Sequence, residues 1–184
     1  MGLYANEGLV EERRFRSADS LLPEMVELFQ KAKWEPTDLD YVGAGMGPGS
    51  FTGIRIGVMA IRALAFALQI PQVGLGSLAL YSDEWPILAD ARIGGVWAEF
   101  PGKAPELIAM EVLEERVRPF RQVLSPDLRT LKAKMLKLGF RGEMLEVQPD
   151  SSRIGKLLMQ ASQQGPNPEI VYLRKTQAEI ELRL

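Results

Sequence analysis

The stretch GAGMGPGSFTGIRIG, from Gly43 to Gly57, combines a glycine-rich loop with the start of an apolar helix. The residues YVGAGMG just before the loop are typical of a strand. A strand, a glycine-rich loop and a helix in this order can present backbone N–H groups to a phosphate. No lysine follows the last glycine, so this is not a Walker loop, and the spacing does not fit G-x-G-x-x-G at a helix start.

Two interpretations of the loop therefore stay open. In the first, it is a phosphate-binding loop, and its residues are Gly47, Gly49, Ser50, Thr52 and Gly53. In the second, it is a tight connection in which the side chain of Ser50 or Thr52 caps the following helix.

The helix predicted after the loop, from about Gly53 to Gln69, is apolar on almost all sides. Its few polar residues, Arg55, Arg62 and Gln69, are seven positions apart and so lie along one stripe. A helix of this kind is normally buried on more than one side. One side can pack against a sheet, and the other side needs a second cover.

A second helix, predicted between Ser17 and Lys33, also has a wide apolar arc. Two such helices side by side would form a hydrophobic surface for a protein partner, or they would simply cover each other. The residues that we assign to a partner interface are Leu21, Leu22, Met25, Phe29, Ile54, Val58, Ile61, Arg62 and Ala65.

Composition excludes several classes of chemistry. The 184 residues include neither cysteine nor histidine, so disulfides, thiolate catalysis and the commonest zinc ligands are absent, and we expect no metal site. The net charge of −2 argues against a protein whose main role is to bind a nucleic-acid backbone.

No signal sequence is evident at the start, and the longest apolar window contains Arg62. We therefore expect a cytoplasmic protein without membrane contact.

Mixed strand and helix patterns predict an α/β protein. Residues 3–15 resemble a hairpin around the turn ANEG, and Ser125–Gly139 and Asp150–Gly165 are typical of capped helices. We expect a short helix from Ser77 to about Asp83, and strands in PELIAMEVLEE and RPFRQVL. Prolines near 101–105 suggest a boundary between a first lobe, residues 1–100, and a reduced second lobe, residues 101–184, whose tail returns to pack on the first.

The segment GMGPGSFTGIRIGVMAIRALA, residues 45–65, resembles the signature of the bacterial TsaB family, also called YeaZ. Three further segments are similar to elements of that family: QIPQVGLGSLALY, ILADARIGGVWAEF and PEIVYLRK. Together these segments extend the resemblance over almost the whole chain.

The resemblance implies an actin-like/hexokinase-like (ASKHA) fold of two α/β lobes with a reduced second lobe. It also implies a non-catalytic scaffold subunit that binds TsaD, the related glycoprotease-like transferase. With the ATPase TsaE, these proteins add a threonylcarbamoyl group to adenosine next to the tRNA anticodon. TsaD would carry the metal and the chemistry, and the surface that binds TsaD in a heterodimer can also form a homodimer.

By the same resemblance, the chain alone would hold no cofactor, ATP or ADP would bind only in the complex with TsaD, and tRNA would be reached only through the complex. The alternative is an independent nucleotide-binding module of the actin-like class that uses the glycine loop. A glycoprotease of the metal-dependent kind would need histidine ligands, which this chain lacks.

The sequence departs from the family pattern in two places. Family members usually begin with a strand carrying I-L-A-I-D-T-S, whereas Met1 stands about where the second strand should start. That strand is normally central in its sheet, so either the start of this sequence is shortened or residues Met1 to Leu3 compensate for the strand. Ala18 and Asp19 stand where members often have a histidine. Both departures argue against nucleotide handling by this chain.

Two charged features complete the analysis. Asp90 and Arg92 of the DAR segment form either a catalytic pair or, as we favour, a structural ion pair or turn anchor. A basic strip in the second lobe could approach tRNA electrostatically, although a solvated helix face is the more ordinary interpretation. Its residues are Arg121, Arg129, Lys132, Lys134 and Lys137.

Overall fold

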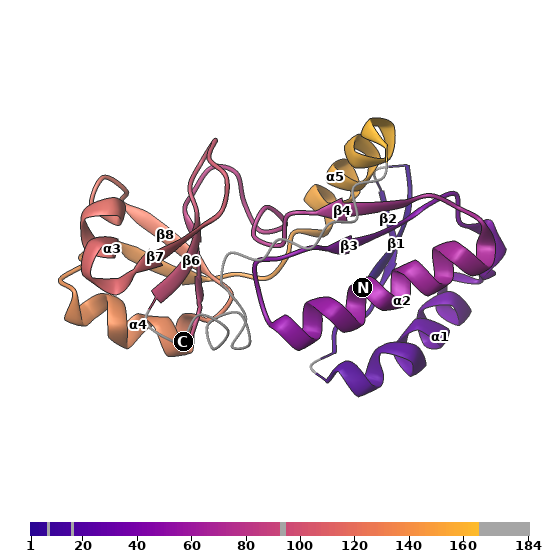
Figure 1. Ribbon diagram of the computed structural model, residues 1–184, viewed down its shortest axis with the longest axis horizontal. Coiled ribbons are helices and arrows are strands. Elements are labelled where there is room, and N and C mark those ends of the chain that lie inside the picture. Colours follow the sequence, from indigo (N-terminus) through magenta and orange to yellow (C-terminus); the bar gives the residue numbers. More distant parts are fainter. Residues whose placement is uncertain (7, 16, 93–94, 166–184) are drawn as a thin grey trace, which may run out of the picture. The chain divides into compact units, whose positions relative to one another are not determined.

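The computed structural model describes residues 1–6, 8–15, 17–92 and 95–165 (Figure 1). The chain forms two compact units. The first contains Met1–Leu80 and the segment that begins at Pro149, and the second contains Tyr81–Gln148.

The first unit begins with the predicted hairpin, in which β1 (Gly2–Ala5) pairs antiparallel with β2 (Gly8–Glu12). Asn6 has a φ of 56°, which suits its place in the turn. A short 3₁₀ turn at Ala18–Ser20 then leads into α1 (Leu21–Ala32), which packs on this hairpin through the buried side chains of Leu28 and Phe29.

The glycine loop connects two parallel strands, β3 (Val42–Gly45) and β4 (Gln72–Leu75), by way of α2 (Phe51–Leu68). Among the described residues no ladder joins this pair to the hairpin, so the strands of the first unit form two separate two-stranded sheets.

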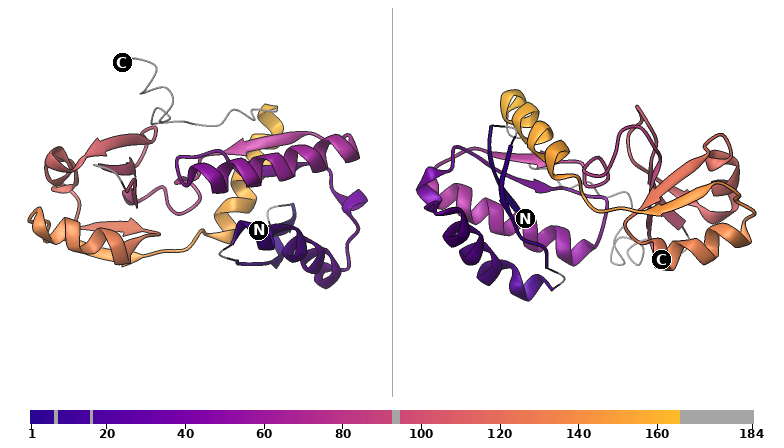
Figure 2. Two further views of the ribbon diagram at one scale, coloured as in Figure 1. Left: turned by 60° about the horizontal axis from the view of Figure 1, so that its bottom comes forward. Right: turned by 180° about the vertical axis from the view of Figure 1, so that it is seen from behind.

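Helix α5 (Ser151–Gln164) packs against both strand pairs of the first unit, because it contacts β2 and β4 (Figure 2). At its first residue, the Ser151 hydroxyl donates to Glu12 Oε2 at 2.6 Å. Farther along, a methyl group of Leu158 lies against Gly43, where an added Cβ would approach it to 2.5 Å. A glycine at position 43 therefore lets α5 lie close to β3.

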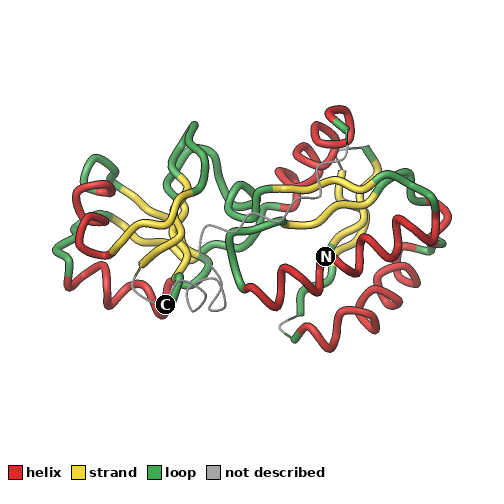
Figure 3. Tube along the Cα trace, in the orientation of Figure 1, coloured by secondary structure: helices red, strands yellow, loops and turns green. Residues whose placement is uncertain are grey.

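The second unit is built on one five-stranded sheet in the order β7-β6-β5-β8-β9 (Figure 3). Its strands are β5 (Ile87–Asp90), β6 (Gly95–Glu99), β7 (Glu106–Ala109), β8 (Gln122–Ser125) and β9 (Glu143–Glu146). The helices α3 (Met110–Val117) and α4 (Leu128–Lys137) share one core with the sheet, in which Leu113, Val117, Leu131 and Met135 are buried.

The structure differs from the sequence-based boundary at residue 100. The division falls after Leu80 because β5 and β6, which we expected in the first lobe, pair with β7 and β8 in the sheet of the second unit. The chain returns to the first unit at Pro149 through α5. The segment PEIVYLRK and the rest of the predicted returning tail lie outside the described residues.

Two local predictions are wrong. Residues 110–117 form α3 and not a strand, because Leu113 and Val117, four positions apart, both face the core. The predicted helix from Ser77 to Asp83 is a series of turns and bends. Ser77 instead pairs with the glycine loop, as described below.

Candidate functional site: an apolar helix face and the turn that precedes it

The glycine loop is held as a turn by Ser77. The N–H of Gly47 donates to Ser77 Oγ at 2.9 Å, and the N–H of Ser77 donates back to the carbonyl of Gly47 at 2.9 Å. Gly47 has a φ of 105°, which L-residues with a side chain rarely adopt. An alanine Cβ at Gly45 would lie only 2.8 Å from the same Ser77 hydroxyl. These glycines are therefore required by the turn itself.

The start of α2 uses further groups of the loop. Ser50 Oγ accepts a hydrogen bond from the N–H of Gly53 at 3.3 Å, so Ser50, and not Thr52, is the N-cap residue. Because Gly47 and Gly53 already have acceptors, two of the donors that a phosphate loop would offer are occupied. The exposed side chains of Ser50 and Thr52 remain at the surface.

Only a narrow stripe of α2 faces the strands. Val58 is fully buried and Ala65 nearly so, and they lie seven positions apart, against β3 and β4. Phe51, Ile56, Met59 and Phe66 are exposed although they are large and apolar. The second cover expected for this helix is therefore not supplied by the described residues.

Helix α1 runs alongside α2 in Figure 1 and also exposes apolar side chains. We define the apolar helix face by its exposed residues, with their exposed fractions: Leu22 (66%), Val26 (57%), Ile56 (37%), Met59 (60%) and Phe66 (78%). Scattered exposed apolar residues are normal, but five large ones on two neighbouring helices are typical of an interaction site.

Three of the predicted interface residues cannot belong to such a surface. The side chains that lie on the inward stripes of α1 and α2 are buried within the chain: Phe29, Val58 and Ala65. Leu22 is well exposed, and the remaining residues are partly exposed: Leu21, Met25, Ile54, Ile61 and Arg62. Four large exposed apolar residues of the same helices were not in the predicted set: Val26, Ile56, Met59 and Phe66. Met59 and Phe66 are seven positions apart in the sequence, as residues on one stripe of a helix are. A helix that is apolar on almost all sides, however, does not show which of its stripes faces the core.

A hollow lies beside Phe66 at the end of α2. It is lined by Arg62, Ala65, Phe66, Gln69, Ile70 and Gln72. The Oε1 atom of Gln72 is buried and has no hydrogen-bond partner among the described residues. The apolar helix face therefore borders a recess that contains polar groups.

Helix α2 is also long and apolar enough, by length and composition alone, to cross a membrane. One such helix is weak evidence for a span, because packed helices of soluble proteins pass the same criterion. In this chain α2 connects two paired parallel strands and packs on both of them, as a helix of an α/β unit does.

The DAR segment of the second unit is a turn anchor. Lys134 Nζ donates to both carboxylate oxygens of Asp90, at 2.8 and 2.9 Å, and the N–H of Arg92 donates to Asp90 Oδ1 at 2.8 Å. Burial alone would raise the pKa of the Asp90 carboxyl, but the hydrogen bonds from Lys134, Arg92 and Thr130 and the charge of Lys134 outweigh burial and lower it. The ion pair is thus Asp90–Lys134, while the Arg92 side chain is exposed.

Within the described part of the chain, no three histidine, cysteine, aspartate or glutamate side chains are placed to hold a metal ion.

Comparison with known proteins gives the family. Residues 12–84 match the family model described as TsaD, tRNA N6-adenosine threonylcarbamoyltransferase. The tRNA threonylcarbamoyladenosine biosynthesis protein TsaB of Buchnera aphidicola is 31% identical over 161 residues, which are 80% of this chain and 72% of that protein. The chain belongs to the TsaB family. The TsaB protein of Bacillus subtilis is 30% identical over 168 residues, 84% of this chain and 70% of the relative.

A solved structure supports the fold. YeaZ from Pseudomonas aeruginosa superposes with a TM-score of 0.69 at 21% identity, covering 88% of this chain and 87% of that one. The actin-like α/β fold that the resemblance implies is thereby confirmed. As a TsaB family member, the chain belongs to a group whose named relatives are biosynthesis proteins for threonylcarbamoyladenosine in tRNA.

Proposed function

We propose that this TsaB family member is a non-catalytic scaffold subunit that binds the TsaD transferase during formation of threonylcarbamoyladenosine in tRNA. The observation that carries the proposal is the apolar helix face, which leaves Leu22, Val26, Met59 and Phe66 more than half exposed. Burying such side chains in an interface stabilises a complex by about 1.5 to 3 kcal/mol for each side chain that becomes fully buried.

The match to the TsaD family model adds a reason to choose a related transferase as the partner. The matched residues, 12–84, contain both α1 and α2. Proteins that share a fold can pack through equivalent helices, as two copies do in a symmetric dimer. A homodimer through the same face is the competing arrangement, and both cannot occupy the face at once.

The other parts of the proposal follow from this role. TsaE would join through the complex, tRNA would be bound with TsaD, and the modification of tRNA would take place in the cytoplasm.

An independent nucleotide-binding function is less well supported by the loop, since the hydroxyls of Ser77 and Ser50 already accept hydrogen bonds from the N–H groups of Gly47 and Gly53. We propose that ATP or ADP binds only when TsaD is present, which a calorimetric titration of the chain with and without TsaD would measure.

The test of partner binding replaces exposed residues and spares the core. Met59→Ser combined with Phe66→Ser should weaken the association with TsaD at least tenfold, because large exposed anchors carry most of an interface's energy. The matched control is Val112→Ser combined with Leu145→Ser, two exposed apolar residues of the second unit. It should leave the association unchanged.

Binding is measured by co-purification and by titration calorimetry with purified TsaD. Full association of the Met59/Phe66 variant would show that the apolar helix face is not the TsaD surface. Sedimentation of the chain alone distinguishes TsaD binding from self-association through this face. If the native chain is a dimer, if the Met59/Phe66 variant is a monomer and if that variant still binds TsaD, the apolar helix face serves self-association instead. Binding of the native chain to lipid vesicles through α2 would point to a membrane instead.

A further inference from the structure

The hollow at the C-terminal end of α2 contains a polar group that the fold of the first unit does not use. The hollow has a volume of about 350 Å³, and its walls come from α2, from the turn after that helix and from the first residue of β4. That first residue is Gln72, whose Oε1 atom is buried without a hydrogen-bond partner among the described residues. A buried acceptor in this state costs free energy, so a ligand that satisfied it would gain affinity.

Strand alternation explains why a glutamine lies beneath the end of α2. Val73 and its cross-strand partner Gly43 lie on the face that α5 covers, where Leu158 contacts Gly43. Side chains alternate along a strand, so Gln72 lies on the opposite face, together with α2. An apolar side chain would serve the packing of α2 on β4 equally well. Packing alone therefore does not explain a glutamine at this position.

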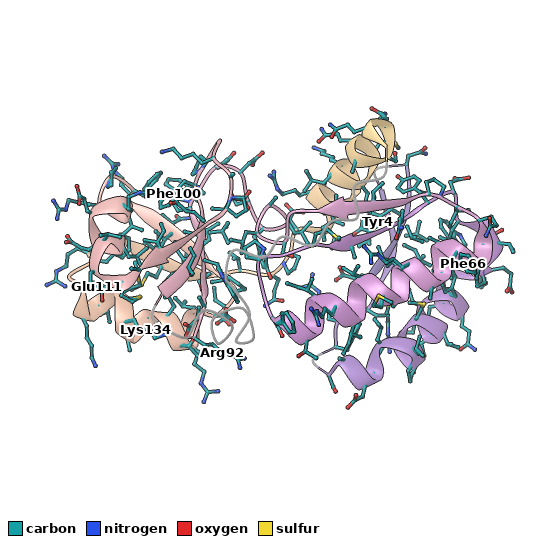
Figure 4. All side chains as sticks on the ribbon, viewed as in Figure 1. Tyr4, Phe66, Arg92, Phe100, Glu111 and Lys134 are labelled. Atoms are coloured by element: carbon teal, nitrogen blue, oxygen red, sulfur yellow. The ribbon has the colours of Figure 1, made fainter. Side chains whose placement is uncertain are left out.

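Three further residues of the hollow decide which ligand fits it. Gln69 Nε2 already donates to the carbonyl of Phe66 at 2.5 Å, which leaves the oxygen of this amide for a ligand. Arg62 supplies a guanidinium with several N–H donors, enough for a ligand as well as for contacts within the chain. Phe66, labelled in Figure 4 toward the end of α2, is 78% exposed and offers an aromatic ring. None of the described residues that line the hollow carries a carboxylate.

These groups select against a charged side chain in the hollow. An ammonium group would be repelled by Arg62, and a carboxylate cannot donate to the oxygens of Gln69 and Gln72. A phenol hydroxyl suits both kinds of group, because it donates one hydrogen bond and accepts others. Its ring can stack on Phe66 and on the guanidinium of Arg62. The terminal torsion of a glutamine is broad, so a rotation of Gln72 turns Oε1 toward such a donor.

We propose that the hollow receives a tyrosine side chain of the protein that binds the apolar helix face. The hollow is continuous with that face, because Phe66 belongs to both. Tyrosine is also among the residues that carry most of the energy of an interface when they fill such a pocket. The inference rests on the proposed function for the identity of the protein, TsaD, whereas the tyrosine follows from the groups that line the hollow.

The first test uses p-cresol, which is the side chain of tyrosine, and the whole chain without TsaD. In an NMR titration of the isotopically labelled chain, p-cresol should shift the amide resonances of Arg62, Phe66, Gln69 and Ile70. Toluene at the same concentration should shift them less, because it has the ring but not the hydroxyl that the amide oxygens accept from.

Gln72→Met then separates a binding role from a structural one. It keeps the length of the side chain and removes the amide, so the urea midpoint of the free chain should rise as the unpaired buried acceptor disappears. The same variant should weaken the binding of p-cresol and of TsaD roughly fivefold each, the effect of one hydrogen bond. The matched control is Gln122→Met, since Gln122 is also a partly buried first residue of a strand, in the second unit. It should leave both affinities unchanged.

The inference is overturned if p-cresol causes no shifts at the hollow, if toluene shifts the resonances equally, or if Gln72→Met binds TsaD as the native chain does. It is also overturned if Gln72→Met weakens self-association in sedimentation and not TsaD binding, because the occupant is then a second copy. Phe66→Leu provides a second substitution at an exposed position, and it should weaken p-cresol binding by removing the ring.

The two proposals fail separately. If p-cresol binds at the hollow through Gln72 but the native chain does not hold TsaD, the scaffold proposal fails and the chemistry of the hollow stands. If TsaD binding depends on Met59 and Phe66 while p-cresol does not bind at the hollow, only the tyrosine inference fails.

Discussion

At the scale of single residues, the turn before α2 depends on small side chains at fixed positions. The pair of hydrogen bonds between Gly47 and Ser77 closes the loop, and Gly45 leaves room for the Ser77 hydroxyl. The motif that first suggested a phosphate site is therefore explained by close packing around one serine.

Replacing Gly45 tests this explanation. Gly45→Ala would place its Cβ 2.8 Å from Ser77 Oγ, and we expect a loss of about 1 to 3 kcal/mol in the free energy of unfolding from that overpacking. Gly57→Ala, in the middle of α2, is the control, because apart from its chain neighbours and the adjacent helix backbone no atom lies within 4 Å of the added Cβ. It should raise stability by about 0.5 to 1 kcal/mol. Urea unfolding measures both, and an unchanged Gly45→Ala protein would refute the packing argument.

The Asp90 carboxylate predicts a pH dependence. Its pKa is lowered in the folded chain, so it contributes stability that is present above the ordinary carboxyl pKa of about 4 and is lost as the pH falls through the lowered value. Asp90→Asn should therefore make stability fall less steeply between pH 4 and pH 3 in urea unfolding. Lys134→Gln should reduce the slope in the same direction, and Lys103→Gln, an exposed lysine, should not. Identical slopes in all four proteins would contradict the assignment.

At the scale of elements, one stripe of α2 packs against the strands and another stripe is exposed, although both are apolar. The stripe of Val58 and Ala65 packs on the strands, while Met59 and Phe66, each one position farther along, are open. A substitution should therefore affect either folding or association, according to the stripe on which it lies.

This division can be measured. Val58→Ala should lower the free energy of unfolding by roughly 1 to 3 kcal/mol, because it leaves a cavity against β3 and β4. Met59→Ser should change it by no more than about 0.5 kcal/mol, as surface substitutions usually do. Thermal unfolding of the two variants beside the native chain gives the comparison. Equal destabilisation would show that Met59 is covered in the free chain.

At the scale of the whole molecule, the chain has two compact units with separate cores. Leu3, Leu28 and Phe29 form a cluster in the first unit, and Leu113, Leu131 and Met135 belong to the large cluster of the second. Separate cores allow each unit to open without the other.

Amide hydrogen exchange tests the independence of the units. Leu131→Ala should destabilise the second unit by about 2 to 5 kcal/mol and speed exchange in β5 and β8, while β3 and β4 keep their native protection. Leu28→Ala should produce the reverse pattern. Faster exchange throughout the chain in either variant would mean that the units unfold together.

The sequence by itself determined the α/β class, the hairpin, the presence of a capped helix after the glycine loop and, through the resemblance, the family and the actin-like fold. These depend on local signals: turn residues, capping groups and long motifs. Only the tertiary structure decided the boundary at Leu80, the inward stripe of α2 and the Asp90–Lys134 pair. Strand pairing and the direction of a helix face depend on residues that are distant along the chain. Local periodicity can therefore predict that α2 is a helix, but not which of its apolar side chains remain exposed.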